Sequence, residues 1–347
     1  MNLSKKICWF ITDKSKPARI ARQRVKLLFL IALFIALFWV IPINRVISAI
    51  FSASLSLLLL GLIIQVPSTF LNALQLKLLT QKQGLTLGIF QVWMINLAIK
   101  FYTLFMQGTL AASGIRWYKL SQKDNKPAEA LASVAFYRLI ETFITIILGL
   151  SFYLLNPSKP VEVNASLLIA VLAAMTIFWI GITRLSLPLL SRIKYNFASL
   201  IEKPGWKPIF KIIEKILLAV AAFSGFSAWE LFQVIAAGIS QQLVSAISNY
   251  FFALAIGIAL PLKDIIWISS LIVLASQIPI AVAGGLGVRE ASLVVLMPAF
   301  GVSKELALAY SLLLFIKSLL ISLAGGLIEL IQTLQDKPAA HPEINKG

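Results

Sequence analysis

The sequence predicts an all-α, polytopic integral membrane protein, and three observations lead to this fold class. First, 59% of the 347 residues are apolar and only 13% are charged. Soluble domains are about a quarter charged, so this chain cannot cover a globule with polar surface. Second, its apolar residues form runs long enough to cross a bilayer, and third, its basic residues gather in the polar stretches between those runs. The mean hydropathy of +0.90 agrees with a position in lipid.

Eight apolar stretches are long enough to be transmembrane helices, because a bilayer core about 30 Å thick requires about 20 residues. They are residues 27–48, 51–76, 87–108, 128–154, 163–183, 228–257, 264–283 and 304–331. Two shorter apolar pieces, residues 109–122 and 285–300, contain glycines and an arginine. This combination is typical of re-entrant segments or half-helices, so we predict about eight transmembrane helices plus two such pieces.

The distribution of charge predicts how the chain is oriented. The formal net charge is +17, and residues 1–26 form a basic segment with a single acid. If both short pieces also cross the membrane, the basic interfacial stretch at 184–225 and the polar tail at 332–347 face the cytoplasm, as the positive-inside rule requires. We therefore expect a cytoplasmic-membrane protein with both termini cytoplasmic; a cleaved signal peptide at the N-terminus is the alternative. Anionic lipid headgroups account for the charge better than nucleic acid does.

The two halves of the chain, residues 51–154 and 228–331, resemble each other at a spacing of about 175 residues and are joined by residues 155–227. The residues that recur in order are Gly61, Gln65, Asn72, Gly114 and Arg116, matched by Gly238, Gln242, Asn249, Gly287 and Arg289. An odd number of crossings separates the start of one copy from the start of the other. The sequence therefore predicts an inverted internal repeat, which is a transporter architecture.

The composition excludes several kinds of chemistry. The chain has one cysteine and one histidine, so disulfide frameworks, Cys/His metal sites and Ser-His-Asp hydrolysis lack their residues. We expect no metal, no cofactor and no enzymatic activity.

Two arginine segments are the leading candidates for a binding site. One contains Gly114 and Arg116, and the other contains Gly285, Gly287, Arg289 and Glu290. Glycines allow the backbone to turn and expose N–H groups at a helix start, and an arginine beside them can hold a phosphate. The alternative is an arginine that reaches the interface or that pairs with Glu290.

Polar residues within the apolar helices form a second set of candidates, because each is costly to place in lipid. Arg138 and Glu141 are three residues apart on one helical face and are expected to pair, either as a structural pair or as a contact to the substrate. The remaining polar residues define a secondary track. Its amides are expected either to form hydrogen bonds between helices or to line a substrate path at the interface of the two halves, and Lys100 is equally compatible with snorkelling. The residues of the track are Lys100, Asn96, Gln65, Asn72, Gln242, Asn249 and Lys317.

The segment GGLGVREASL at 284–293, the segment FGVS at 300–303 and Gly325-Gly326 resemble a family signature. They are similar to the flippase-like transmembrane region of the lysylphosphatidylglycerol synthase family, and the likeness covers residues 25–331. The resemblance implies a protein that moves a phospholipid or lipid-linked intermediate between leaflets. Only about 16 polar residues follow the last span, so we expect a stand-alone member without the soluble aminoacyltransferase domain.

The leading hypothesis is a lipid translocase for an anionic or phosphate-bearing headgroup. Two alternatives stay open. One is a membrane-embedded glycosyl or aminoacyl transferase acting on lipid-linked substrates, and the other is a non-transporting partner of a lipid-synthesis enzyme.

Overall fold

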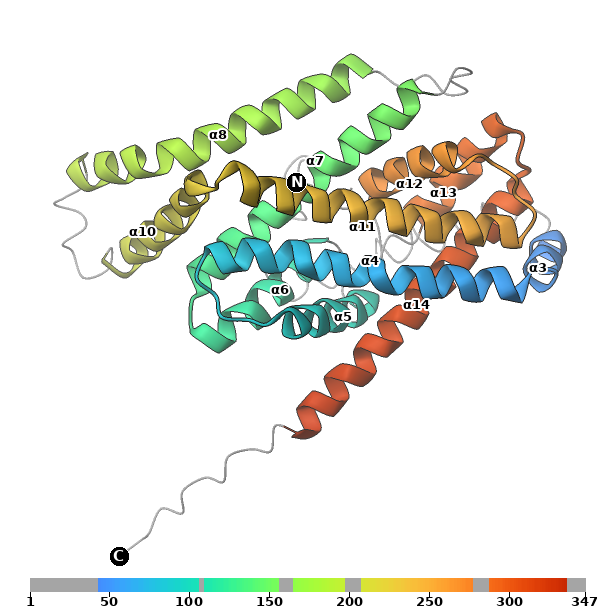
Figure 1. Cartoon of the computed structure of the whole chain (residues 1–347), viewed down its shortest axis with the longest axis horizontal. Coiled ribbons are helices and arrows are strands. Elements are labelled where there is room, and N and C mark those ends of the chain that lie inside the picture. The colour runs from blue at the N-terminus through green and yellow to red at the C-terminus, as the bar shows by residue number, and fades with distance from the viewer. Residues whose placement is uncertain (1–42, 106–108, 156–164, 197–206, 277–286, 336–347) are drawn as a thin grey trace, which may run out of the picture.

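The computed structural model describes residues 43–105, 109–155, 165–196, 207–276 and 287–335, and every regular element in these ranges is a helix (Figure 1). Most of the predicted first span and the whole basic N-terminal segment lie outside the described residues. The first half contains α3 (Ile43–Phe51), α4 (Leu55–Lys82), α5 (Ile89–Phe105), α6 (Thr109–Asp124) and α7 (Pro127–Leu154). The middle of the chain forms α8 (Ala165–Asn196), α10 (Lys207–Ala221) and a short 3-10 turn, η1 (Ala222–Gly225). The second half contains α11 (Ala228–Ala255), α12 (Leu262–Ser276), α13 (Val288–Leu296), η2 (Met297–Phe300) and α14 (Lys304–Gln335).

Four of the described helices are long and apolar enough to cross a membrane, namely α4, α7, α11 and α14. A fifth candidate is α8, whose two arms, Ile169–Gly181 and Arg184–Asn196, meet at an angle of 51°. The predicted spans at 87–108 and 264–283 correspond to the shorter helices α5 and α12. The chain is therefore an all-α, multi-pass membrane protein, and the count of eight spans stays a prediction.

Helix α4 is apolar on the outside and polar on the inside, the reverse of a helix in a soluble protein. Its exposed residues include Leu55, Leu59 and Ile63, whereas Gln65 and Gln75 are buried. An apolar outer surface suits contact with acyl chains, and buried amides must then find partners within the bundle.

Helices α4 and α11 lie side by side and run antiparallel (Figure 1). A Cβ atom placed at Gly61 would lie 2.7 Å from the ring of Phe252, and one placed at Gly238 would collide with the side chain of Gln75. Ser68 also donates a hydrogen bond to the carbonyl oxygen of Gln241 at 3.2 Å. Small residues therefore allow the two helices to approach closely along most of their length.

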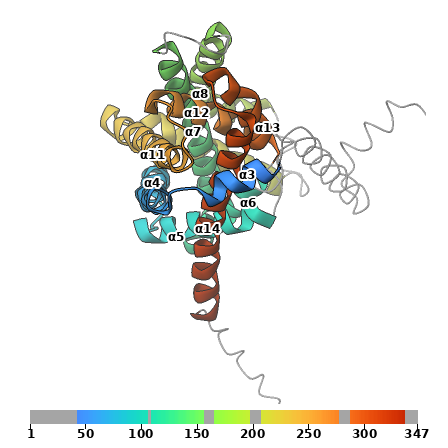
Figure 2. The same ribbon diagram turned by 90° about the vertical axis from the view of Figure 1, so that its right-hand side faces the viewer.

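Glycines also determine how the other long helices pack. Helix α14 packs on α5, where a Cβ at Gly325 would collide with the backbone of Leu97. Helix α7 packs on α12, where a Cβ at Gly149 would lie 3.0 Å from the Cβ of Ser270. Figure 2 shows α14 running through the bundle, with its C-terminal part projecting beyond the other helices.

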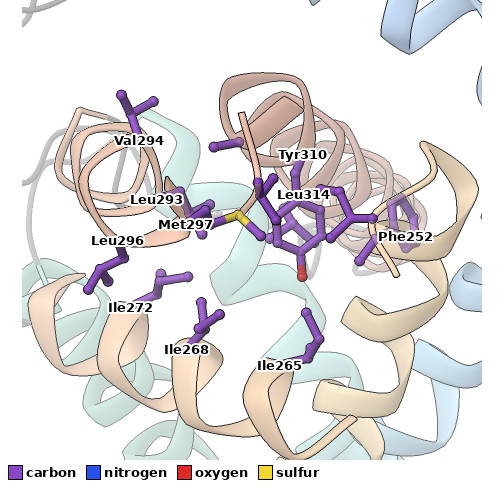
Figure 3. Close-up of a cluster of buried hydrophobic side chains, with 14 of the residues drawn as sticks. Phe252, Ile265, Ile268, Ile272, Leu293, Val294, Leu296, Met297, Tyr310 and Leu314 are labelled. Atoms are coloured by element: carbon purple, nitrogen blue, oxygen red, sulfur yellow. The ribbon is translucent and has the colours of Figure 1, made fainter. Parts of the chain in front are cut away.

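A core of buried apolar side chains holds the second half together. Figure 3 shows Phe252 of α11, Ile265 and Ile268 of α12, Leu293 of α13 and Tyr310 of α14 converging on one cluster. Leu293, Ile265 and Ile268 are almost completely buried. This packing holds α13, which has only nine residues, against two longer helices.

Two helix starts follow simple sequence rules. Helix α7 begins with Pro127, whose missing N–H is not needed in a first turn. Helix α11 begins with a capping box, in which Ser227 accepts from the Glu230 backbone at 3.2 Å and the Glu230 carboxylate accepts from the Ser227 backbone at 2.7 Å.

Candidate functional site

A polar cavity of about 330 Å³ lies among α7, α11, α12, α13 and α14. Its charged lining residues are Arg138 and Glu141 from α7, Arg289 from α13 and Lys317 from α14. The remaining polar lining residues are Ser245, Asn249, Ser269, Ser276 and Ser318. Candidates that lie far apart in the sequence therefore meet at one place inside a membrane protein.

Arg138 and Glu141 form the predicted ion pair at one side of the cavity. Their Nη1 and Oε2 atoms are 3.0 Å apart. The Nε atom of Arg138 also donates to the hydroxyl of Ser113 on α6 at 3.3 Å, and the hydroxyl of Tyr137 donates to Glu141 at 3.3 Å. These contacts hold the pair in place while leaving both side chains partly exposed to the cavity.

Arg289 and Glu290 form a second ion pair at the start of α13. The Nη2 atom of Arg289 lies 2.7 Å from Oε1 of Glu290, whose carboxylate is fully buried. The same carboxylate accepts from the Gly287 backbone N–H at 2.6 Å and from the Ser311 hydroxyl at 3.0 Å. Gly287 has a φ of 89°, a left-handed conformation that favours glycine. The structure has the expected glycine turn followed by a helix start, and Arg289 pairs with Glu290, as in the alternative to a headgroup contact for this arginine.

Lys317 projects from the middle of α14 and is buried. Its ammonium donates to the side-chain oxygen of Gln65 at 3.1 Å, to the Ser248 hydroxyl at 3.3 Å and to the amide oxygen of Asn249. It also lies 5.3 Å from the ring centroid of Phe252. Within the described part of the chain it has no ion pair with a carboxylate, so only neutral dipoles and one aromatic ring compensate its charge.

Arg116 occupies a different environment from Arg289. It is buried in α6, and its guanidinium lies 4.7 Å from the ring centroid of Tyr137. Its Nε and Nη1 atoms have no hydrogen-bond partner among the described residues. Arg116 is not among the residues that line the cavity, but Tyr137 connects it to Glu141.

The structure differs from the sequence prediction at Gly114. Helix α6 continues without a break from Thr109 to Asp124, and no atom lies within 4 Å of a Cβ placed at Gly114. Arg116 is therefore inside a helix, whose N–H groups are already used, and not at a helix start. Gly285, a glycine of the other arginine segment, lies outside the described residues.

The amide residues of the secondary track bond across helix interfaces. Asn96 donates to Asn72 at 3.1 Å, and Asn72 donates to the Tyr137 hydroxyl at 2.6 Å. Gln242 donates to Thr145 at 2.6 Å, and Asn249 donates to Ser269 at 3.0 Å. Lys100 is partly buried on α5, where it interacts electrostatically with Glu141 and Arg116. These amides therefore form hydrogen bonds between helices.

Several residues of the site were not predicted from the sequence. Tyr137 is the most important, because it contacts Arg116, Asn72 and Glu141. Its position directly before Arg138 was the available signal. The serines of α12 and α14 gave no such signal, since single hydroxyls are common in membrane helices.

The described residues contain no group of three or more His, Cys, Asp or Glu side chains that could hold a metal ion. The lining of the cavity combines the carboxylate of Glu141 with guanidinium, ammonium and hydroxyl donors, and these donors are suited to an anionic oxygen ligand.

The sequence model of a known family, the lysylphosphatidylglycerol synthase TM region, matches residues 25–326. The chain belongs to this family. No curated protein and no solved structure matches the chain. Membership makes this a multi-pass membrane protein of a lipid-related family, and it places the cavity within the region that defines the family.

Proposed function

We propose that this member of the family is a lipid translocase that moves an anionic, phosphate-bearing headgroup between leaflets. The observation that carries the proposal is the cavity in which Arg138 and Glu141 meet Arg289 and Lys317. Its volume of about 330 Å³ is at the lower end of the range typical of small-molecule sites. It therefore suits a polar headgroup whose acyl chains remain in the surrounding bilayer.

The transport route, in this proposal, lies between two inverted repeats. Gly61 corresponds to Gly238, and Gln75 corresponds to Phe252, because both pairs have the same spacing in the sequence. Gly61 packs on Phe252, and Gly238 packs on Gln75, so the same contact occurs twice with the two halves exchanged. The packing of α5 on α14 and of α7 on α12 forms a matching pair. Such exchanged contacts are expected when two copies are related by a two-fold axis in the membrane plane.

The proposed orientation places both termini in the cytoplasm of a cell whose cytoplasmic membrane holds the protein. The basic residues of α8 and α10 would then face the inner leaflet. A hydrogen-bonded ion pair of 2.7 Å between Lys194 and Glu214 connects these two helices, and Arg184, Arg192 and Lys211 are exposed on them. This arrangement leaves several cations free to contact anionic headgroups.

Transport is favoured over catalysis because the carboxylates of the site already have partners. Glu141 is bonded to Arg138, and Glu290 accepts from Arg289, Ser311 and the Gly287 backbone. A general acid or base needs a carboxylate that is free to exchange a proton with the substrate.

The proposal is tested by leaflet-resolved exchange of a labelled phosphatidylglycerol in reconstituted vesicles. Arg289→Ala and Arg116→Ala are compared with the unaltered protein, and Lys215→Ala is the control that removes a distant cation. We expect Arg289→Ala to slow exchange about tenfold or more, because one charged hydrogen bond contributes about 1.5–3 kcal/mol. Arg289→Ala leaves the buried carboxylate of Glu290 without its partner. The double variant Arg289→Gln/Glu290→Gln removes both charges and therefore avoids this defect. Unchanged exchange in both Arg289 variants and in Arg116→Ala would contradict the proposal.

A further inference from the structure

The charges around the cavity are unbalanced. Five buried or partly buried cations belong to this region, and they are Lys100, Arg116, Arg138, Arg289 and Lys317. Among the residues that the structure describes, two carboxylates accompany them, those of Glu141 and Glu290. Counted with every side chain in its ordinary charge state, five cations against two carboxylates give a formal excess of three positive charges among the described residues.

The five cations act on one another and not as separate sites. Three of them line the cavity itself, namely Arg138, Arg289 and Lys317. Lys317 interacts electrostatically with Lys100 and with Arg289, and Arg116 interacts with Arg138 and Glu141. The cavity therefore adjoins one electrostatically coupled group of charges, which extends from α13 and α14 to α5 and α6 and includes the carboxylate of Glu141.

Placing the uncompensated cations inside the membrane costs free energy. A charge at the centre of a membrane helix costs about 2.5–3.5 kcal/mol on insertion scales. Within the described residues Arg116 keeps two nitrogen atoms without an acceptor, and neither Lys100 nor Lys317 has an ion pair. Buried charges without partners are costly, so an anionic ligand that neutralises them would bind with a strong electrostatic contribution.

We infer that the headgroup handled by this site carries at least two negative charges, as in a lipid phosphomonoester or a lipid diphosphate. This inference rests on the proposed function and specifies its substrate class. A phosphodiester such as phosphatidylglycerol brings one negative charge and leaves an excess of two positive charges. A phosphomonoester brings about 1.5–2 negative charges at pH 7, and a diphosphate brings more. A lysyl-carrying headgroup has a net positive charge, which would add to the repulsion.

The test measures binding to the purified full chain in detergent with three ligands that share one prenyl tail. The ligands are the prenyl alcohol, the prenyl monophosphate and the prenyl diphosphate, so only the charge of the head differs. We expect affinity to rise about tenfold from alcohol to monophosphate and at least about tenfold again to the diphosphate. Lysylphosphatidylglycerol is expected to bind more weakly than phosphatidylglycerol.

Two variants assign the preference to the cavity. Lys317→Gln retains a hydrogen-bond donor but removes the charge, and it should lower the preference for diphosphate over monophosphate about tenfold. Lys100→Gln serves the same purpose if Lys317→Gln does not fold. Lys215→Gln, which removes an exposed cation from α10, should leave the preference unchanged.

The outcomes separate this inference from the proposed function. Equal affinity for the monophosphate and the diphosphate, or a preference that Lys317→Gln and Lys100→Gln leave intact, would overturn the inference even if phosphatidylglycerol is exchanged between leaflets. Charge-dependent binding without any leaflet exchange of a phosphomonoester lipid would support the inference and overturn the translocase proposal.

Discussion

Arg116 and Tyr137 are in direct contact, with the guanidinium carbon 4.7 Å from the centroid of the phenol ring. The same tyrosine accepts a hydrogen bond from Asn72 and donates one to Glu141. Tyr137 therefore connects α6 and α4 to the ion pair that lines the cavity. A side chain with this position should affect stability through two separable contributions, the ring and the hydroxyl.

Replacing Tyr137 with Phe tests the hydroxyl alone. The ring remains beneath Arg116, but the Asn72 amide loses its acceptor in a partly buried position. We expect a loss of about 1–3 kcal/mol, the usual cost of an unsatisfied buried group. Thermal unfolding in detergent measures the change, and Tyr137→Leu should be less stable still because it also removes the ring. Equal stability of Tyr137→Phe and the unaltered protein would show that the Asn72 contact contributes nothing.

Two glycines should respond in opposite ways to the same substitution. Gly325→Ala places a Cβ against the backbone of Leu97, which cannot move without shifting α5. We expect a loss of about 1–3 kcal/mol from overpacking. Gly114→Ala has free space around it and should stabilise α6 by up to about 1 kcal/mol through helix propensity. Thermal unfolding of both variants checks the pair, and a destabilised Gly114→Ala would indicate a backbone turn that α6 does not have.

The ion pair between Lys119 and Glu329 joins α6 to the projecting part of α14. Their Nζ and Oε1 atoms are 2.6 Å apart, both side chains are about four-fifths buried, and the Tyr102 hydroxyl also donates to Glu329. Glu329→Gln leaves Lys119 without its partner, and we expect a loss of about 2 kcal/mol, between the values for exposed and buried pairs. The charge swap Lys119→Glu/Glu329→Lys should recover part of this loss in the same unfolding assay. A swap that is no more stable than Lys119→Glu alone would refute a specific pairing.

Acid should weaken the connection between α6 and the start of α5. The carboxylate of Asp124 accepts from the Thr86 hydroxyl at 2.6 Å and from the Thr86 backbone at 2.7 Å. These hydrogen bonds hold the pKa of Asp124 below its ordinary value of 3.8. Because the folded pKa is the lower one, the stabilisation is complete well above pH 3.8 and is lost as the pH falls through the folded value.

The difference in stability between the unaltered protein and Asp124→Asn measures this effect. It should be constant above about pH 5 and shrink at lower pH. Hydrogen exchange at the Thr86 amide provides a local measurement. A difference that does not change with pH would mean that the carboxylate is not the group that titrates.

The long helices α4, α7, α11 and α14 could be predicted, because a membrane span requires an apolar run of about 20 residues. The sequence also predicted the Arg138–Glu141 pair, since residues three apart share a helical face. The sequence predicted equivalent positions at a helix start for Arg116 and Arg289, but Arg116 lies inside α6 and Arg289 lies in the first turn of α13. Gly114 is a single glycine, which a packed helix tolerates at a cost of about 1 kcal/mol, whereas Gly287 adopts a positive φ directly before the start of α13.

The position of Lys317 beside Asn249 and Gln65 could not be predicted in detail. Its partners come from α4 and α11, and only the packing of glycines between those helices brings them together. The same is true of Tyr137, whose role depends on three neighbours from different helices. Such contacts depend on tertiary packing and leave no local pattern in the sequence.

The most direct test of the central claim is to block the cavity during transport. With Cys8 replaced by Ser, one cysteine is introduced at Ser276, which lines the cavity and whose hydroxyl donates to the Ile272 carbonyl of its own helix at 2.7 Å. The control cysteine replaces Thr176, whose hydroxyl has the same kind of bond, at 2.8 Å, but which lines an apolar groove between α7, α8 and α11. A negatively charged thiol reagent at Ser276→Cys should reduce leaflet exchange to the background rate, and at Thr176→Cys it should leave exchange unchanged. Full exchange after complete modification of Ser276→Cys would contradict passage of the headgroup through this cavity.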